Sequence, residues 1–138
     1  TSRRVTAGNE LFDFAVTAAG VPVSCEGSVT VWQGEEYRKL WMRFDRGLEF
    51  GLETMPPGIR ILELSAARGF ADPEAAVDAL RLLTERMGLS IDWTTAESSE
   101  VDGVVIEQFW DPEPGLNASA SIGRSEDTIV LLRWSIAP

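Results

Sequence analysis

The fold is decided by residues 36–64, which read EYRKLWMRFDRGLEFGLETMPPGIRILEL. Apolar and polar residues alternate in short runs along this stretch, and a period of two is the pattern of a half-buried β-strand. The runs are separated by Asp45-Arg46-Gly47 and by Met55-Pro56-Pro57-Gly58, which are typical turn sequences. The stretch therefore predicts three strands of an antiparallel meander.

Two helices flank the meander in the sequence. Apolar residues recur at three- and four-residue spacing from about Asn9 to Ala19, and Gly20 follows as a stop. The second helix begins at Asp72, which suits the N-cap and is followed by proline at the first helical position. Its apolar stripe ends before Gly88. A strand over residues 27–32 is predicted between the first helix and the meander.

The chain after Gly88 predicts three or four more strands. The optional one is Ile91 to Thr94, and residues 96–102 are predicted to form a polar acidic loop. Further strands are expected over residues 104–110, 116–122 and 128–136. Residues 1–138 are therefore predicted to form a single α+β domain. A mainly antiparallel sheet of about six to eight strands carries two helices on one face, in the order α-β-β-β-β-α-β-β-β.

The composition removes the residues that many catalytic and metal sites use. Histidine is absent from the 138 residues, which excludes His-dependent triads and metal triads. Cys25 is the only cysteine, so an intramolecular disulfide and a thiolate-rich metal centre are excluded as well. No group of bases lies near Cys25 in the sequence, and we expect a buried or inert thiol. We expect no catalytic residue, no cofactor and no metal site.

Acidic residues are concentrated late in the chain. The formal net charge is −10, and a nucleic-acid backbone would repel such a chain. Between Arg86 and Arg124 there is no basic residue, whereas seven acids occur in this interval. Six of them are the candidate partner-binding carboxylates: Glu97, Glu100, Asp102, Glu107, Asp111 and Glu113. We expect them to form one negative surface that attracts a basic protein.

Trp41 is the candidate aromatic anchor. It falls on the strand side opposite Leu40 and Met42, together with the charged Lys39 and Arg43. An aromatic side chain on a charged, exposed face is typical of a binding hot spot. The alternative is that a helix covers this side, and the sequence leaves both open. Trp110 and Trp134 follow apolar stripes and are expected in the core.

A resemblance supports a binding function. The segment with Leu11, Ala15, Ala18-Ala19-Gly20, then Gly27, Val31-Trp32 and Gly34-Glu35-Glu36-Tyr37-Arg38, resembles small acidic immunity proteins of bacterial polymorphic-toxin systems. The resemblance covers under a third of the chain and includes no diagnostic motif. It implies a protein that blocks a cognate toxin by occluding the toxin's active site.

We therefore expect a non-catalytic acidic protein that neutralises a basic partner, with no nucleic-acid or membrane partner. Thr1-Ser2-Arg3-Arg4 is not followed by the apolar run of a secretory signal as it stands, although a signal already removed would leave no trace, and we expect a cytoplasmic location. One alternative is a secretion chaperone that acts as a homodimer. Another is a small-ligand-binding protein or enzyme, with an apolar pocket in the curved sheet or with paired carboxylates among Glu97, Glu107, Asp111 and Glu113.

Overall fold

One antiparallel sheet contains every strand in the described part of the chain. The computed structural model describes residues 9–20, 22–55 and 58–136. The strands, in chain order, are β1 Ser24–Trp32, β2 Glu35–Arg43, β3 Leu48–Met55, β4 Gly58–Ala66, β5 Ala96–Val101, β6 Val104–Trp110, β7 Ala118–Ser125 and β8 Thr128–Ile136. They are arranged in the order β1-β2-β3-β4-β8-β7-β6-β5. The predicted α+β class is confirmed.

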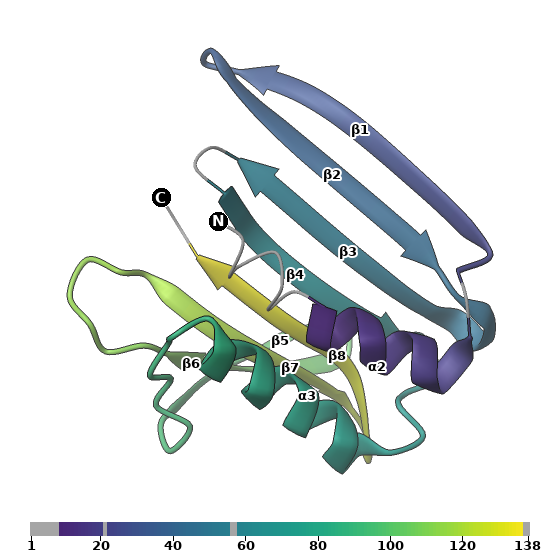
Figure 1. Ribbon diagram of the computed structural model, residues 1–138. Coiled ribbons are helices and arrows are strands. Elements are labelled where there is room, and N and C mark those ends of the chain that lie inside the picture. The colour runs from purple at the N-terminus through teal and green to yellow at the C-terminus, as the bar shows by residue number, and fades with distance from the viewer. Residues whose placement is uncertain (1–8, 21, 56–57, 137–138) are drawn as a thin grey trace.

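The two predicted helices form where the sequence places them. Helix α2 spans Asn9–Ala19 and α3 spans Pro73–Arg86, and a short 3-10 turn, η1, covers Asp45–Gly47. The Asp72 side chain accepts a hydrogen bond from the backbone N–H of Ala75, so it is the N-cap of α3. Figure 1 shows α2 and α3 lying on the same face of the sheet.

The region between α3 and β6 differs from the prediction. Residues 96–101 form strand β5 rather than a loop, because each of them is paired with a residue of β6. Residues 91–94 are not a strand: Oδ1 of Asp92 accepts hydrogen bonds from the N–H of Thr94 at 3.0 Å and from its hydroxyl at 2.6 Å. The hydroxyl bond, followed by the backbone bond, lowers the pKa of Asp92. The resulting turn leads the chain into β5.

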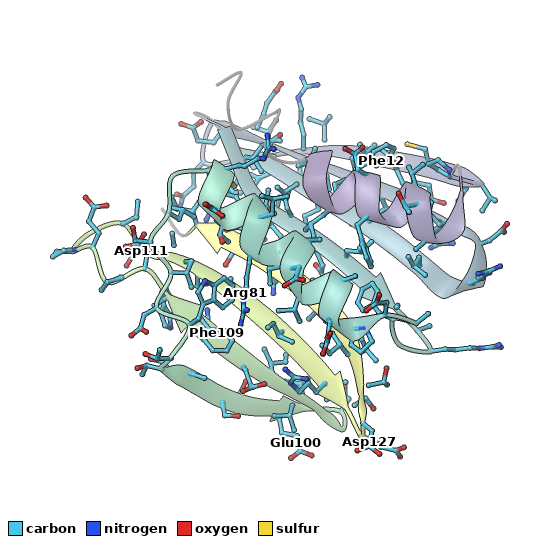
Figure 2. All side chains as sticks on the ribbon, turned by 60° about the horizontal axis from the view of Figure 1, so that its bottom comes forward. Phe12, Arg81, Glu100, Phe109, Asp111 and Asp127 are labelled. Carbon is cyan, nitrogen blue, oxygen red and sulfur yellow. The ribbon has the colours of Figure 1, made fainter. Side chains whose placement is uncertain are left out.

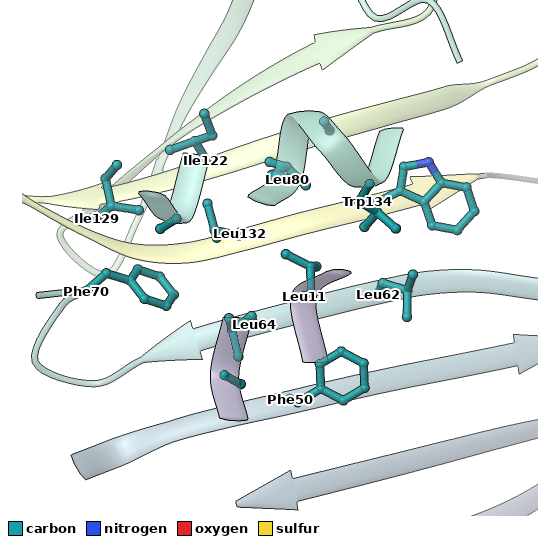
Figure 3. Close-up of a cluster of buried hydrophobic side chains, with 14 of the residues drawn as sticks. Leu11, Phe50, Leu62, Leu64, Phe70, Leu80, Ile122, Ile129, Leu132 and Trp134 are labelled. Atoms are coloured by element: carbon teal, nitrogen blue, oxygen red, sulfur yellow. The ribbon is translucent and has the colours of Figure 1, made fainter. Parts of the chain in front are cut away.

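The core lies between the helices and the sheet. Helix α2 packs on β3 and β4, whereas α3 packs on β7 and β8. Leu11 of α2 and Leu80 of α3 are fully buried against Leu64 and Leu132 in the middle of the sheet (Figure 3). Trp134 belongs to this cluster and is 1% exposed, so its predicted core position is confirmed.

The chain builds the same unit twice, each time as one helix followed by four antiparallel strands. Register irregularities occur between Glu53 and Thr54 in the first unit and between Gly123 and Arg124 in the second, 70 positions later. Glu63 and Arg133 are also 70 positions apart, and they are directly paired across β4 and β8. An approximate two-fold axis therefore passes through this central pair.

Candidate binding surface

Trp41 lies on the sheet face that no described helix covers. Its neighbours Leu40 and Met42 point to the helix side, where Met42 packs against the core. Side chains alternate along a strand, so Trp41 lies on the opposite side. Of the two alternatives left open by the sequence, the structure has Trp41 uncovered and half-buried. We call this side of the sheet the open face.

The indole of Trp41 packs against a glycine on the neighbouring strand. Trp41 of β2 is paired with Gly51 of β3, which in turn is paired with Glu63 of β4. A Cβ at Gly51 would lie 3.8 Å from Cδ1 of Trp41 and 3.9 Å from Cβ of Glu63. Because Gly51 has no side chain, the ring has a flat backbone platform beside a carboxylate.

Charged residues surround this ring on the same face. Strand alternation and register place four carboxylates and two bases around Trp41; the group, which we call the Trp41 surface, consists of Glu26, Lys39, Trp41, Arg43, Glu49, Glu53 and Glu63. Arg43 and Glu49 form an ion pair at 3.6 Å, exposed enough to be weak. Glu49, Glu53 and Glu63 are half-buried. The Trp41 surface therefore combines an aromatic ring with an excess of negative charge.

Two hydrogen-bond donors further along the open face lack partners. Nε of Arg133 and Nε1 of Trp110 are buried, and neither has a hydrogen-bond acceptor among the described residues. Arg133 is the direct neighbour of Glu63 across β4 and β8, yet these two side chains form no ion pair in the described structure. Trp110 is half-buried on this face, so its predicted place in the core is wrong; Phe109 is the core residue of β6. Buried donors without acceptors are rare in folded proteins.

The six acids predicted from the sequence do not form one surface. Asp111 is only 9% exposed, and its two carboxylate oxygens accept the backbone N–H groups of Ser90 at 2.8 Å and Glu113 at 2.9 Å. Glu107 accepts a hydrogen bond from Nε of Arg124 at 2.8 Å. Asp111 therefore has a structural role, and the charge of Glu107 is neutralised by the chain itself.

The other four acids are dispersed. Glu97 and Glu100 are exposed on β5, but they lie an odd number of positions apart and so face opposite sides of the sheet. Asp102 is in the β5–β6 turn and Glu113 follows the other end of β6. Figure 2 shows Glu100 and Asp111 at different ends of this hairpin. The prediction of a single patch from these residues was wrong.

The acids beside Trp41 could have been found from the sequence. Glu49 and Glu53 alternate with Phe50 and Leu52 in β3, just as Trp41 alternates with its apolar neighbours in β2. The alternation alone assigns them to the side opposite the core. What the alternation does not give is the strand register, which brings Gly51 and Glu63 beside the Trp41 ring.

An apolar cleft lies elsewhere in the described part of the molecule. A cleft of about 570 Å³ separates the end of α2 from the start of α3, with Phe14, Leu48 and Phe70 in its apolar wall and Arg46 and Arg68 among its polar residues. Residues of both helices and Leu48 of β3 line it, with two phenylalanines, Phe14 and Phe70, and no tryptophan. The carboxylate in its lining, Asp72, is the N-cap of α3.

Three further observations concern metal binding, membrane crossing and the cysteine. In residues 9–20, 22–55 and 58–136, no group of three or more His, Cys, Asp or Glu side chains is arranged to hold a metal ion. Neither described helix has the length and hydropathy that a membrane crossing requires. Cys25 is exposed on β1, so of the two expectations for this thiol, buried or inert, the structure excludes the first.

Comparison with protein-family models, with curated proteins and with solved structures finds no match to this chain.

Proposed function

We propose that this chain is a non-catalytic binding protein that holds a basic protein partner on the open face of its sheet, with Trp41 as the anchor. The observation that carries the proposal is the Trp41 surface: a half-buried indole on a glycine platform, on an uncovered face, beside Glu49, Glu53 and Glu63. Arginine and lysine side chains are attracted both to an indole face and to carboxylates.

The rest of the open face supports docking of a polypeptide rather than a lone cation. Nε of Arg133 and Nε1 of Trp110 lack an acceptor among the described residues, and because both atoms are buried, a partner's carbonyl or carboxylate would reach them only after these side chains move. The resemblance to immunity proteins adds a specific role, in which the partner is a toxin whose activity is blocked on binding. That role predicts inhibition of the partner in addition to capture.

The test is affinity capture from the native host at about 50 mM salt, followed by a salt gradient and by variants of the Trp41 surface. Because long-range attraction between exposed charges is screened, the partner should elute well before about 500 mM salt. Trp41→Ala should weaken binding about 30-fold, the loss expected for an aromatic hot spot, and Glu53→Gln with Glu63→Gln should flatten the salt dependence.

Matched controls separate the Trp41 surface from the acids that the structure disperses. Glu97→Gln and Glu113→Gln change the net charge as much as the Glu53 and Glu63 variants do, but they lie away from Trp41. They should leave affinity nearly unchanged. A partner whose affinity is insensitive to Trp41→Ala but falls with Glu97→Gln and Glu113→Gln would refute the proposal, as would a captured partner that is itself acidic. Inhibition of a catalytic partner by one equivalent of the chain tests the immunity role.

A further inference from the structure

The two outer strands of the sheet differ, although equivalent units contribute them. β1 has nine residues and one charged side chain, Glu26. β5 has six residues and two, Glu97 and Glu100. Short length and charged side chains are devices that keep an edge strand from pairing with another chain. β5 is shorter and has two charged side chains, whereas β1 is longer and has one, so β1 is the less protected of two equivalent edges.

Exposed apolar side chains also gather at β1. Six large hydrophobic residues of the described chain are exposed, and Val23, Val29 and Val31 are three of them. Val29 is 57% exposed and Val31 is 66% exposed, on the helix side of the sheet but beyond the reach of α2. β-branched side chains fit a pleated, half-buried strand surface, whereas Val29 and Val31 of β1 are exposed.

The hydrogen-bond pattern fixes which backbone groups of β1 are free. The N–H of Phe44 donates to the carbonyl of Leu48, so even-numbered residues of β2 bond to β3 and odd-numbered ones bond to β1. Through the β1–β2 register, alternate residues of β1 direct their N–H and C=O groups outward; they are Cys25, Gly27, Val29 and Val31. Among the described strands, none pairs with this side of β1.

We propose that β1 pairs with β1 of a second copy of this chain, antiparallel and centred on Ser28, so that two sheets join edge to edge. This register overlaps all nine residues and sets outward-directed groups opposite one another, for about eight new hydrogen bonds. Val29 then faces Gly27 of the other copy, where there is no side chain to obstruct it. Glu26 faces Thr30, so no like charges are opposed. This pairing uses the sheet edge and does not depend on the proposed binding function of the open face.

The test is sedimentation equilibrium of the full chain over a range of concentrations, which should give a reversible dimer of twice the 15.1 kDa chain mass. Val29→Pro removes one outward N–H without removing a bond to β2, and an edge strand tolerates proline at such a position. Because both copies carry the substitution, the dimer loses two hydrogen bonds and gains two proline rings at its junction, and it should be weakened at least about tenfold. Ser98→Pro is the matched control, because the N–H of Ser98 is outward-directed on β5.

The control variant should dimerise like the parent, and circular dichroism should show both variants folded. A chain that stays monomeric at all concentrations refutes the pairing. This holds even if β1 is then found to pair with a strand of a different protein. The pairing is also refuted by a dimer that Ser98→Pro abolishes and Val29→Pro does not.

The only cysteine gives a second measurement that needs no substitution in β1. In the proposed register, Cys25 of one copy and Cys25 of the other are six residues apart along the paired strands, about 20 Å at about 3.3 Å per residue. Nitroxide labels on Cys25 should therefore give a distance of this order by pulsed electron paramagnetic resonance. A dimer with labels more than about 40 Å apart would show that another surface makes the contact.

Discussion

Asp111 joins segments that are distant in the sequence. Its side chain accepts the N–H groups of Ser90 and Glu113, and its own N–H donates to the carbonyl of Ala118. The carboxylate thereby fixes the exit from α3 against the β6–β7 loop. An acid that the sequence offers as a binding group is used to satisfy partly buried backbone donors instead.

Asp111→Ala should lower the free energy of unfolding by about 1–3 kcal/mol, because two backbone N–H groups lose their acceptor. Urea unfolding followed by tryptophan fluorescence measures this loss. Glu113→Ala removes a neighbouring exposed carboxylate and should change the unfolding free energy by less than about 0.5 kcal/mol. Equal effects of the two substitutions would mean that Asp111 contributes only its charge.

The faces of Trp41, Glu49 and Glu53 were predictable from the sequence, whereas the register that brings Gly51 and Glu63 beside Trp41 was not. Trp41 could be assigned to the polar side of its strand from alternation alone, which needs only local sequence. The predicted acids failed because nearness in the sequence does not give a common face: Glu97 and Glu100 are three positions apart on a strand and point to opposite sides. Their partners, such as Arg124 for Glu107, come from another strand and depend on register.

At the scale of the elements, the connection between β4 and α3 contains a glycine, Gly69, that packs closely against β8. Gly69 has a φ of +84°, and its N–H donates to the carbonyl of Ala66. A Cβ at this position would overlap Oγ1 of Thr128 and would lie 2.8 Å from its Cγ2. Both the backbone conformation and the close approach require glycine.

Gly69→Ala should be markedly more destabilising than Gly103→Ala. Both glycines have positive φ, +84° and +80°, so the backbone strain of an alanine is shared. Only Gly69 adds an overlap, since nothing lies within 4 Å of a Cβ at Gly103. The expected difference in thermal or urea unfolding is about 1–3 kcal/mol, the usual cost of overpacking.

Thr128→Ala in the Gly69→Ala background removes the overlapping atoms Oγ1 and Cγ2. It should recover part of the lost stability. Equal destabilisation by Gly69→Ala and Gly103→Ala would show that the loop moves away from β8 at no cost.

Elements with strong local signals were predicted well, whereas β5 was missed. The cap at Asp72 and the apolar stripe that follows it are sufficient to place α3. β5 contains only one large apolar residue, Val101, and all six of its residues are exposed. Its strand conformation comes from pairing with β6 through the turn at Asp102-Gly103, where both residues have positive φ. Hydrophobic periodicity cannot detect a strand that buries nothing.

At the scale of the whole molecule, the two repeated units are not independent of each other. They share one sheet through the β4–β8 pairing, in which residues 61–65 are paired with residues 131–135. Leu64 and Leu132, both fully buried, are opposite each other there, and Trp134 lies opposite Leu62. The centre of the fold is thus the junction itself, and each unit completes its core with residues of the other.

Amide hydrogen exchange should follow this two-fold arrangement rather than the chain order. The amides of β4 and β8 should exchange most slowly, because they are released only by global unfolding, and protection should fall outward to β5, whose exposed pairs open locally. Mass spectrometry of peptides from each strand measures the gradient. If residues 73–136 exchanged together while residues 22–55 stayed protected, the units would unfold separately and the β4–β8 junction would not be the core of the fold. A single protected centre at β4–β8 would mean that docking on the open face is supported by the most stable strands of the molecule.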